Sequence, residues 1–361
     1  MRLFQNSALY PAYLPRLKLL TQDVTTFAGQ RDRFLADRFG APHFLKPVLD
    51  DAAEAFFANG DEERSQRAWA REQGMPGKPT LRAILLAQIE SHRTEIFYNM
   101  DPMRYDSSFV RQIPGCVRRS IAWRAAPSPG ADFVAYDAIV SNFPTILKGY
   151  ARDGARTAPF FPAHDPVLDD YAMNNDRPVD VLFVGGYSRH HRQRAKLLEA
   201  VAELSDRYVV ALHIDRSRMT RLADTPLGWF GPLVPHRRPI AFRAVTRGPL
   251  FGRELYEALS RSKIVLNGAI DMAGNERGNM RCFEAMGARA ALLSDEGVYP
   301  SGMDPDRTLI TYRTPSDAVA TLGTLLLDKA RREELAANGN EMLRHRYSKA
   351  MQWAAFQDIA A

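Results

Sequence analysis

The feature that most constrains the fold is a pair of apolar runs around one polar segment. The runs are residues 263–270 (KIVLNGAI) and 288–295 (ARAALLSD), and the segment between them includes residues 275–287 (NERGNMRCFEAMG). The order of strand, polar loop, short helix and strand is that of a βαβ unit. Ligands of open parallel sheets bind at the carboxyl ends of the strands. We therefore expect this loop, with its two glutamates and an arginine, to hold a ligand that has hydroxyls and negative charge, such as a nucleotide sugar.

The length of 361 residues predicts two domains of similar size. The βαβ pattern starts again at residues 179–188 (VDVLFVGGYS), with a helix expected at 192–204 and a strand at 207–215. Four prolines and four aspartates between Pro159 and Pro178 are typical of a linker. The predicted organisation is a Rossmann-like domain at 1–160, a linker at 161–178, a second Rossmann-like domain at 179–335, and C-terminal helices at 336–361 that pack across both domains.

The first domain is predicted from its own apolar runs. Helical signals dominate residues 23–72, including 47–60 (PVLDDAAEAFFANG), and apolar residues recur at helical spacing in 81–93. Five strands are expected in this half of the chain, at 1–7, 94–101, 116–125, 136–142 and 156–166. The pattern favours an α/β fold with two Rossmann-like domains that face a cleft.

Composition excludes several classes of protein. No run reaches the roughly 18–20 apolar residues of a membrane span, and the N-terminus lacks the charged and apolar regions of a signal peptide. The two cysteines, Cys116 and Cys282, have no metal-ligand spacing, so we expect a reducing, cytoplasmic location. The net charge of +6 comes without any nucleic-acid-binding motif, so no nucleic-acid partner is expected. Peripheral association with an acidic membrane stays open.

Six segments carry a resemblance to a known family. VDVLFVGGYSRHHRQRAKLLEAV, GPLFGRELYEALSRSKIVLNGAI and GNMRCFEAMGARAALLSDEG resemble the C-terminal half of group 1 GT-B glycosyltransferases. The segments ALYPAYL, QRAWAREQG and LLAQIESHRTEIFYNMD are similar to the acceptor domain of the spore-maturation-type branch. The resemblance implies a glycosyltransferase (hexosyltransferase-like) of the GT-B fold, whose C-terminal helices cross back to the first domain. The absence of a GxGxxG motif argues against a nicotinamide dehydrogenase.

Glycosyl transfer needs positive groups and backbone N–H donors around the departing diphosphate. Gly185 and Gly186 allow close backbone approach at the end of a strand, and Ser188, Arg189 and Arg192 open the next helix. We interpret these five residues as a diphosphate cluster; an ordinary β–α turn with solvated arginines is the alternative.

The segment at 275–287 supplies the remaining donor residues. The resemblance implies that Glu284, which we expect to open the helix, holds the ribose hydroxyls, and that Glu276 contacts the donor sugar or its phosphate side as a catalytic residue. Seven residues separate the two, as in the family, although Glu276 lies in GNERGN where the family often has a more apolar loop. Asn275, Asn279 and Arg281 complete the predicted pocket, and Arg281 has the alternative of pairing with Glu284.

In similar proteins the backbone near Arg247, Gly248 and Leu250 reads the base edge, and plain capping of the next helix is the alternative. Two further candidates for catalysis lie in the first domain. His43 has a side chain that titrates in a useful range, and Asp101 ends a strand. A packing role for His43 and a capping role for Asp101 stay open.

The pair His190–His191 cannot share a helical face, so we expect no metal and no cofactor other than a nucleotide-diphosphate sugar as co-substrate. The predicted reaction is metal-independent transfer to a hydroxyl of a glycan, lipid-linked or protein acceptor, with the two-glutamate pattern favouring retention. Two alternatives remain: a nucleotide-sugar epimerase or phosphorylase on the same fold, and a non-catalytic nucleotide-sugar-binding subunit. The sugar, the base, the acceptor and the oligomeric state are left open.

Overall fold

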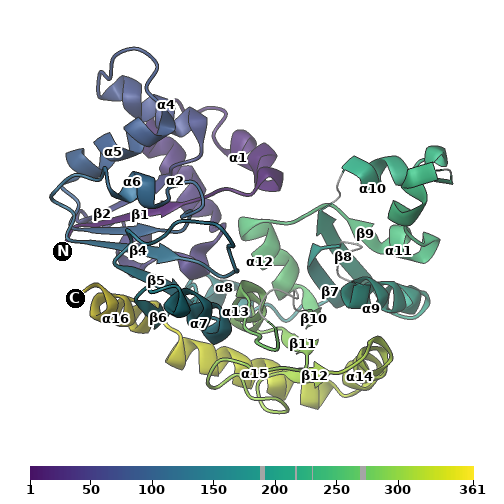
Figure 1. Ribbon diagram of the computed structural model, residues 1–361. Helices are drawn as coiled ribbons and strands as arrows, with labels where there is room; N and C mark the ends of the chain where they lie inside the picture. The colour runs from purple at the N-terminus through teal and green to yellow at the C-terminus, as the bar shows by residue number, and fades with distance from the viewer. Residues whose placement is uncertain (188–191, 216–217, 230, 269–273) are drawn as a thin grey trace. The chain divides into compact units, whose positions relative to one another are not determined.

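The computed structural model describes residues 1–187, 192–215, 218–229, 231–268 and 274–361. The chain divides into two compact units, unit 1 with Met1–Ala163 and Lys349–Ala361, and unit 2 with His164–Ser348. Each unit contains a six-stranded sheet in which all neighbouring strands are parallel, with helices around it (Figure 1). The predicted α/β fold with two Rossmann-like domains is confirmed.

The sheet of unit 1 has the order β2-β1-β3-β4-β5-β6. Its strands are β1 (Leu3–Ser7), β2 (Ala55–Asn59), β3 (Ile96–Asn99), β4 (Arg119–Trp123), β5 (Ala138–Ser141) and β6 (Thr157–Pro159). Five of them lie in runs that the sequence predicts to be strands. β2 corrects the helical prediction for residues 47–60, because Ala and Glu favour a helix locally while Phe57 is buried by pairing of this edge strand with β1.

Helices surround this sheet in unit 1: α1 (Leu14–Leu20), α2 (Phe27–Asp37), α3 (Lys46–Leu49), α4 (Glu63–Glu72), α5 (Leu81–Ser91), α6 (Ser107–Val110), α7 (Pro144–Arg152) and α16 (Lys349–Ala360), with the 3-10 turns η1 (Pro11–Tyr13) and η2 (Ala41–His43). The C-terminal helix α16 is fixed by polar and aromatic contacts. Lys349 is buried and donates from Nζ to the carbonyls of Ala41, Pro42 and Phe44. Phe356 packs on Tyr98, with ring centroids 5.0 Å apart.

The sheet of unit 2 has the order β12-β11-β10-β7-β8-β9, which is the strand order of a doubly wound dinucleotide-binding fold. Its strands are β7 (Val179–Gly186), β8 (Val210–Asp215), β9 (Thr246–Arg247), β10 (Ser262–Leu266), β11 (Ala291–Asp295) and β12 (Ile310–Tyr312). Its helices are α8 (Leu168–Ala172), α9 (Arg192–Ala202), α10 (Arg218–Ala223), α11 (Ile240–Val245), α12 (Gly252–Ser260), α13 (Met280–Gly287), α14 (Pro315–Leu327) and α15 (Lys329–Arg346), with 3-10 turns η3 (Glu203–Asp206), η4 (Pro226–Trp229) and η5 (Gly231–His236).

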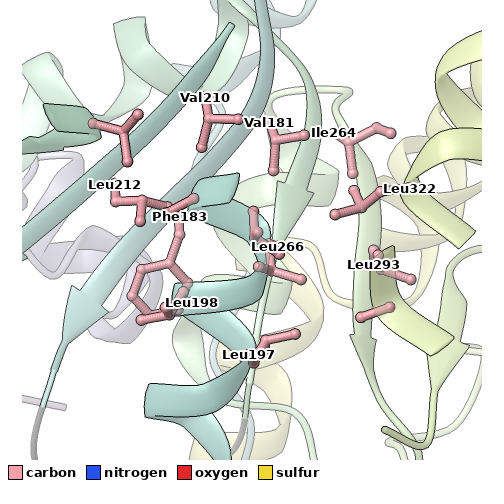
Figure 2. Packing of buried hydrophobic residues seen from close by; sticks show 14 of the residues in the cluster. Val181, Phe183, Leu197, Leu198, Val210, Leu212, Ile264, Leu266, Leu293 and Leu322 are labelled. Atoms are coloured by element: carbon pink, nitrogen blue, oxygen red, sulfur yellow. The ribbon is translucent and has the colours of Figure 1, made fainter. Parts of the chain in front are cut away.

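The core of unit 2 follows from strand alternation. Val181 and Phe183 of β7 point into one hydrophobic cluster with Leu212 of β8 and Ile264 of β10 (Figure 2). Leu197 and Leu198 of α9 and Leu322 of α14 cover the same face of the sheet. Residues two apart on a strand share a face, so this packing fixes which residues reach the carboxyl edge of the sheet.

The two segments outside the predicted Rossmann-like domains have defined places. Residues 161–178, expected as a linker, contain α8, which packs against α12 and α13 within unit 2. The C-terminal segment is divided, because α15 belongs to unit 2 and α16 to unit 1. Among the described residues, no helix has the length and apolar character needed to cross a bilayer.

Candidate functional site

The candidate site lies at the carboxyl edge of the sheet in unit 2. The chain order reverses between β7 and β10, which are hydrogen-bonded neighbours, and this is the switch point at which doubly wound sheets bind ligands. β7 ends in Gly185–Gly186, and Asn267–Gly268 follows β10. A Cβ added at Gly186 would meet no other atom within 4 Å, so the backbone there is open to close approach by a ligand.

Arg194 ties the two strand ends together. Its guanidinium donates to the carbonyl of Gly268 and, over 3.4 Å, to the carbonyl of Gly186. The arginine lies in the first turn of α9, so it reaches both strands from the helix that follows β7. Arg194 was not singled out from the sequence. The structure gives it the role of holding the switch point in shape.

A buried amide joins this edge to the segment after β10. Asn267 is 4% exposed; its Nδ2 donates to Ser294 Oγ over 2.9 Å, and its Oδ1 accepts from Asn279 Nδ2 over 3.1 Å. Burial raises the pKa of the neighbouring Cys282 thiol to about 12. Cys282 is therefore an uncharged packing residue at pH 7. A polar residue directly after the buried strand β10 is the signal that identifies Asn267.

Arg281 and Glu284 form a buried ion pair within α13. Arg281 Nη1 lies 2.7 Å from Glu284 Oε2, and Glu284 is 2% exposed. Glu284 does not open α13 as predicted: the helix begins at Met280, because the polar loop ends at the N-cap Asn279. Burial raises the pKa of Glu284, the Arg281 charge lowers it, and Asp165 raises it. The pairing alternative for Arg281 is confirmed, and its Nε is buried without a hydrogen-bond partner among the described residues.

The loop that carries Glu276 is held by backbone pairing. Asn275 accepts at its carbonyl from Val298 N–H, and Arg277 N–H donates to the Val298 carbonyl, each over 2.8 Å. Arg277 Nε lies 2.6 Å from an Asp295 carboxylate oxygen at the end of β11. Asn275 is exposed and Glu276 is half-buried in the loop that these backbone hydrogen bonds hold.

The residues predicted to contact the nucleobase lie at or just after the end of β9, the outermost strand on one side of the unit 2 sheet. β9 ends at Arg247, which is exposed, and Gly248 accepts a contact of 2.7 Å from His213 Nδ1 at its carbonyl. Leu250 is half-buried, two residues before α12. Since β8 lies between β7 and β9, these residues are about 10 Å from the glycine pair.

Two residues of the predicted diphosphate cluster, Ser188 and Arg189, lie outside the described residues, as does the separate pair His190–His191. Arg192 begins α9, and its side chain is not among those described. Within the described ranges, no group of three or more His, Cys, Asp or Glu side chains is arranged to hold a metal ion. The expectation of a metal-free site stays a prediction.

The two candidates in unit 1 differ in chemistry. Burial and the Lys349 charge lower the pKa of His43 to about 3, so its ring is neutral and a weak base at pH 7. Asp101 follows β3, pairs with Arg104 over 3.2 Å, and has a pKa raised by burial. The structure adds Asp61, which the sequence did not single out, at the end of β2; burial raises its pKa to about 6.

A family model and several solved structures are similar to this chain. A family model described as "Glycosyl transferase-like" matches residues 189–358. The match begins after β7 and covers strands β8 to β12, the loop with Glu276, and helices α9 to α15. The prediction of a glycosyltransferase is confirmed by this match. No curated protein matches the chain by sequence.

Solved structures extend the likeness to the whole chain. The Anabaena HepE protein (Alr3699), solved in complex with UDP and glucose, is 11% identical with a TM-score of 0.59 and 99% coverage of both chains. A glycosyltransferase from Rickettsia africae is 10% identical with a TM-score of 0.56, covering 99% of this chain and 97% of that one. Staphylococcus aureus TarM is 11% identical with a TM-score of 0.53, over 80% of this chain and 59% of TarM. The predicted GT-B fold is confirmed, while the spore-maturation-type branch stays a prediction.

Proposed function

We propose that this chain transfers a sugar from a nucleoside diphosphate sugar to an acceptor hydroxyl, with the donor bound at the β7/β10 switch point of unit 2. One observation carries the proposal: the open glycine backbone of β7, the Asn267–Asn279 contact and the Arg281–Glu284 pair belong to the edge where a doubly wound sheet holds nucleotides. The similar fold of HepE, which was also solved with UDP-glucose, supports this choice of donor class.

The residues have distinct proposed roles. The bond between the anomeric carbon and the diphosphate breaks, a bond from the acceptor oxygen to that carbon forms, and the hydroxyl proton is released. Negative charge then grows on the diphosphate. Backbone N–H groups near Gly186 and the half-buried guanidinium of Arg281 supply positive partial and full charge without reorganising. Glu284 accepts from the ribose hydroxyls, and Glu276 contacts the donor sugar.

We further propose that the transfer needs no metal ion and retains the anomeric configuration. The support is the pair Glu276 and Glu284 with seven residues between them, together with arginines that can balance the diphosphate charge. Activity that survives a chelator and a product with the anomeric configuration of the donor are the expected results. Loss of turnover with the chelator, restored by a divalent ion, would exclude the metal-free route.

The experiment that tests the function is a thermal-shift panel with UDP-, GDP-, dTDP- and CMP-sugars, followed by a transfer assay with the donor that binds. A ligand that binds only the native state raises its apparent stability, by about 2.7 kcal/mol at a hundredfold excess over Kd. Glu276→Gln should keep the shift and lose turnover. If no nucleotide sugar stabilises the protein, the proposal fails.

A further inference from the structure

The connection between β8 and β9 carries the net charge of the protein. Residues 216–247 contain seven arginines and one aspartate, with no lysine and no glutamate, so their net charge of +6 equals that of the whole chain. The other residues are therefore balanced. A charge so concentrated creates a local field that a scattered excess would not.

The connection is larger than the sheet requires. One helix is enough to join two parallel strands, and α11 does this by burying Phe242 and Val245 in the core of the sheet. The elements α10, η4 and η5 are additional and pack on one another. Residues 218–229 and 231–247 form a lobe that Arg238 stabilises from within: its side chain is fully buried and pairs with Asp224, the only acid of residues 216–247.

The lobe exposes large apolar side chains. Ile240 is 75% exposed, Trp229 64%, Val234 51% and Leu222 47%. Arg237 stacks 3.7 Å above the Trp229 ring and donates to the carbonyls of Ala223 and Thr225, so the aromatic ring and the charge are adjacent. Among the described side chains, Arg237, Arg243 and Arg247 have no carboxylate partner within ion-pair distance.

We propose that the lobe of residues 218–229 and 231–247 docks on an anionic phospholipid bilayer, with Ile240, Val234 and Trp229 entering the headgroup region and Arg237, Arg243 and Arg247 facing lipid phosphates. Trp at the membrane interface and basic residues beside apolar ones are the features that bind such surfaces. Each arginine close to an anionic leaflet contributes to affinity. Aliphatic Ile240 and Val234 offer nothing to stack on a base, so the observations favour lipid over nucleic acid. The lobe would bind lipid whether or not the donor site transfers sugar.

The test is co-sedimentation of the full chain with phosphatidylcholine vesicles, with and without phosphatidylglycerol, at low and high salt. We expect binding only to the anionic vesicles, weakened by salt because exposed charges are screened. Vesicles should also shift the fluorescence of Trp229 to the blue, and Trp229→Phe should remove that shift. No binding at low salt would overturn the proposal.

The matched variants are Val234→Ser with Ile240→Ser, against Leu327→Ser. Leu327 is 83% exposed at the end of α14 in the same unit and lies outside the lobe. The lobe variant should lose at least about tenfold in vesicle affinity, and the control should lose nothing. All three side chains are exposed, so equal thermal midpoints are expected. If the lobe variant binds vesicles as the control does, or if an oligonucleotide competes fully with the vesicles, the surface is a general polyanion site and the proposal fails.

Discussion

The two sheets differ in the chemistry at their switch points. In unit 2, Arg194 bridges Gly186 at the end of β7 and Gly268 just after β10, and the Arg281–Glu284 pair lies in α13. In unit 1, β1 lies between β2 and β3, and the residues beyond the ends of those neighbours are Asp61 and Asp101. A glycine and arginine edge suits a diphosphate, whereas a carboxylate edge suits a neutral ligand with many hydroxyls. The same architecture thus offers two different binding edges.

The largest expected effect concerns the buried pair of unit 2. Glu284→Ala should lower the free energy of unfolding by about 3–5 kcal/mol, because Arg281 would keep a buried charge without a partner. Chemical denaturation measures this loss. The double variant Arg281→Met with Glu284→Met should recover most of the stability and still fail to bind the donor. Equal instability of the single and double variants would contradict the ion-pair account.

The next effect tests the acidic edge of unit 1. The pKa of Asp61 is raised from 3.8 to about 6, so the folded state holds its proton more tightly than the unfolded chain. The stability from this carboxyl is therefore complete below pH 3.8 and is lost as the pH rises through about 6. Asp61→Asn should be more stable than wild type at pH 7, by up to about 3 kcal/mol less the screening due to partial exposure, and equal to it near pH 3.

Asp106→Asn is the control of opposite sign for Asp61. Hydrogen bonds from Ser108 and from backbone N–H groups lower the pKa of Asp106, so its contribution is present above its unfolded value and is lost as the pH falls. Unfolding midpoints measured between pH 3 and 7 should move in opposite directions for the two variants. Parallel profiles would show that Asp61 is not desolvated and would remove the contrast between the edges.

A smaller effect is expected at the bridge between β7 and β10. Arg194→Met removes charged donors from the carbonyls of Gly186 and Gly268, which should cost about 1.5 kcal/mol of stability and weaken donor binding. Arg194→Lys keeps the charge without the planar fork and should recover only part of both. Full recovery by lysine would mean that charge alone, and not the bridging geometry, matters here.

The fold could be read largely from apolar runs, because buried parallel strands leave continuous hydrophobic stretches. The strands β1, β3, β7 and β10 fall in the predicted runs. The helical prediction for residues 47–60 was wrong because the alanines and Glu54 favour a helix locally, and only the pairing of β2 with β1 decides the state of this segment. The two-residue β9 is too short to leave any periodic signal.

The candidate site was less predictable than the fold. Gly186, Asn279 and Arg281 could be proposed because they lie next to apolar runs in the sequence. Arg194 could not, since its partner Gly268 is 74 residues away and the hydrogen bond is made to a carbonyl, which no side-chain pattern reveals. Asp61 was missed because its raised pKa comes from burial by the fold and not from its neighbours in sequence.

The central claim is that the β7/β10 edge holds the donor, and Gly186→Ala tests it most directly. The added methyl would meet nothing within 4 Å in the protein, so the unfolding midpoint should stay that of wild type. It would occupy the space that the diphosphate needs, so titration calorimetry should show donor affinity lower by about tenfold or more. Gly323→Ala, in α14 and also free of contacts, should leave donor affinity unchanged, and its unfolding midpoint should rise because Ala favours a helix interior over Gly. Unchanged donor affinity in Gly186→Ala would contradict the placement of the donor at this edge.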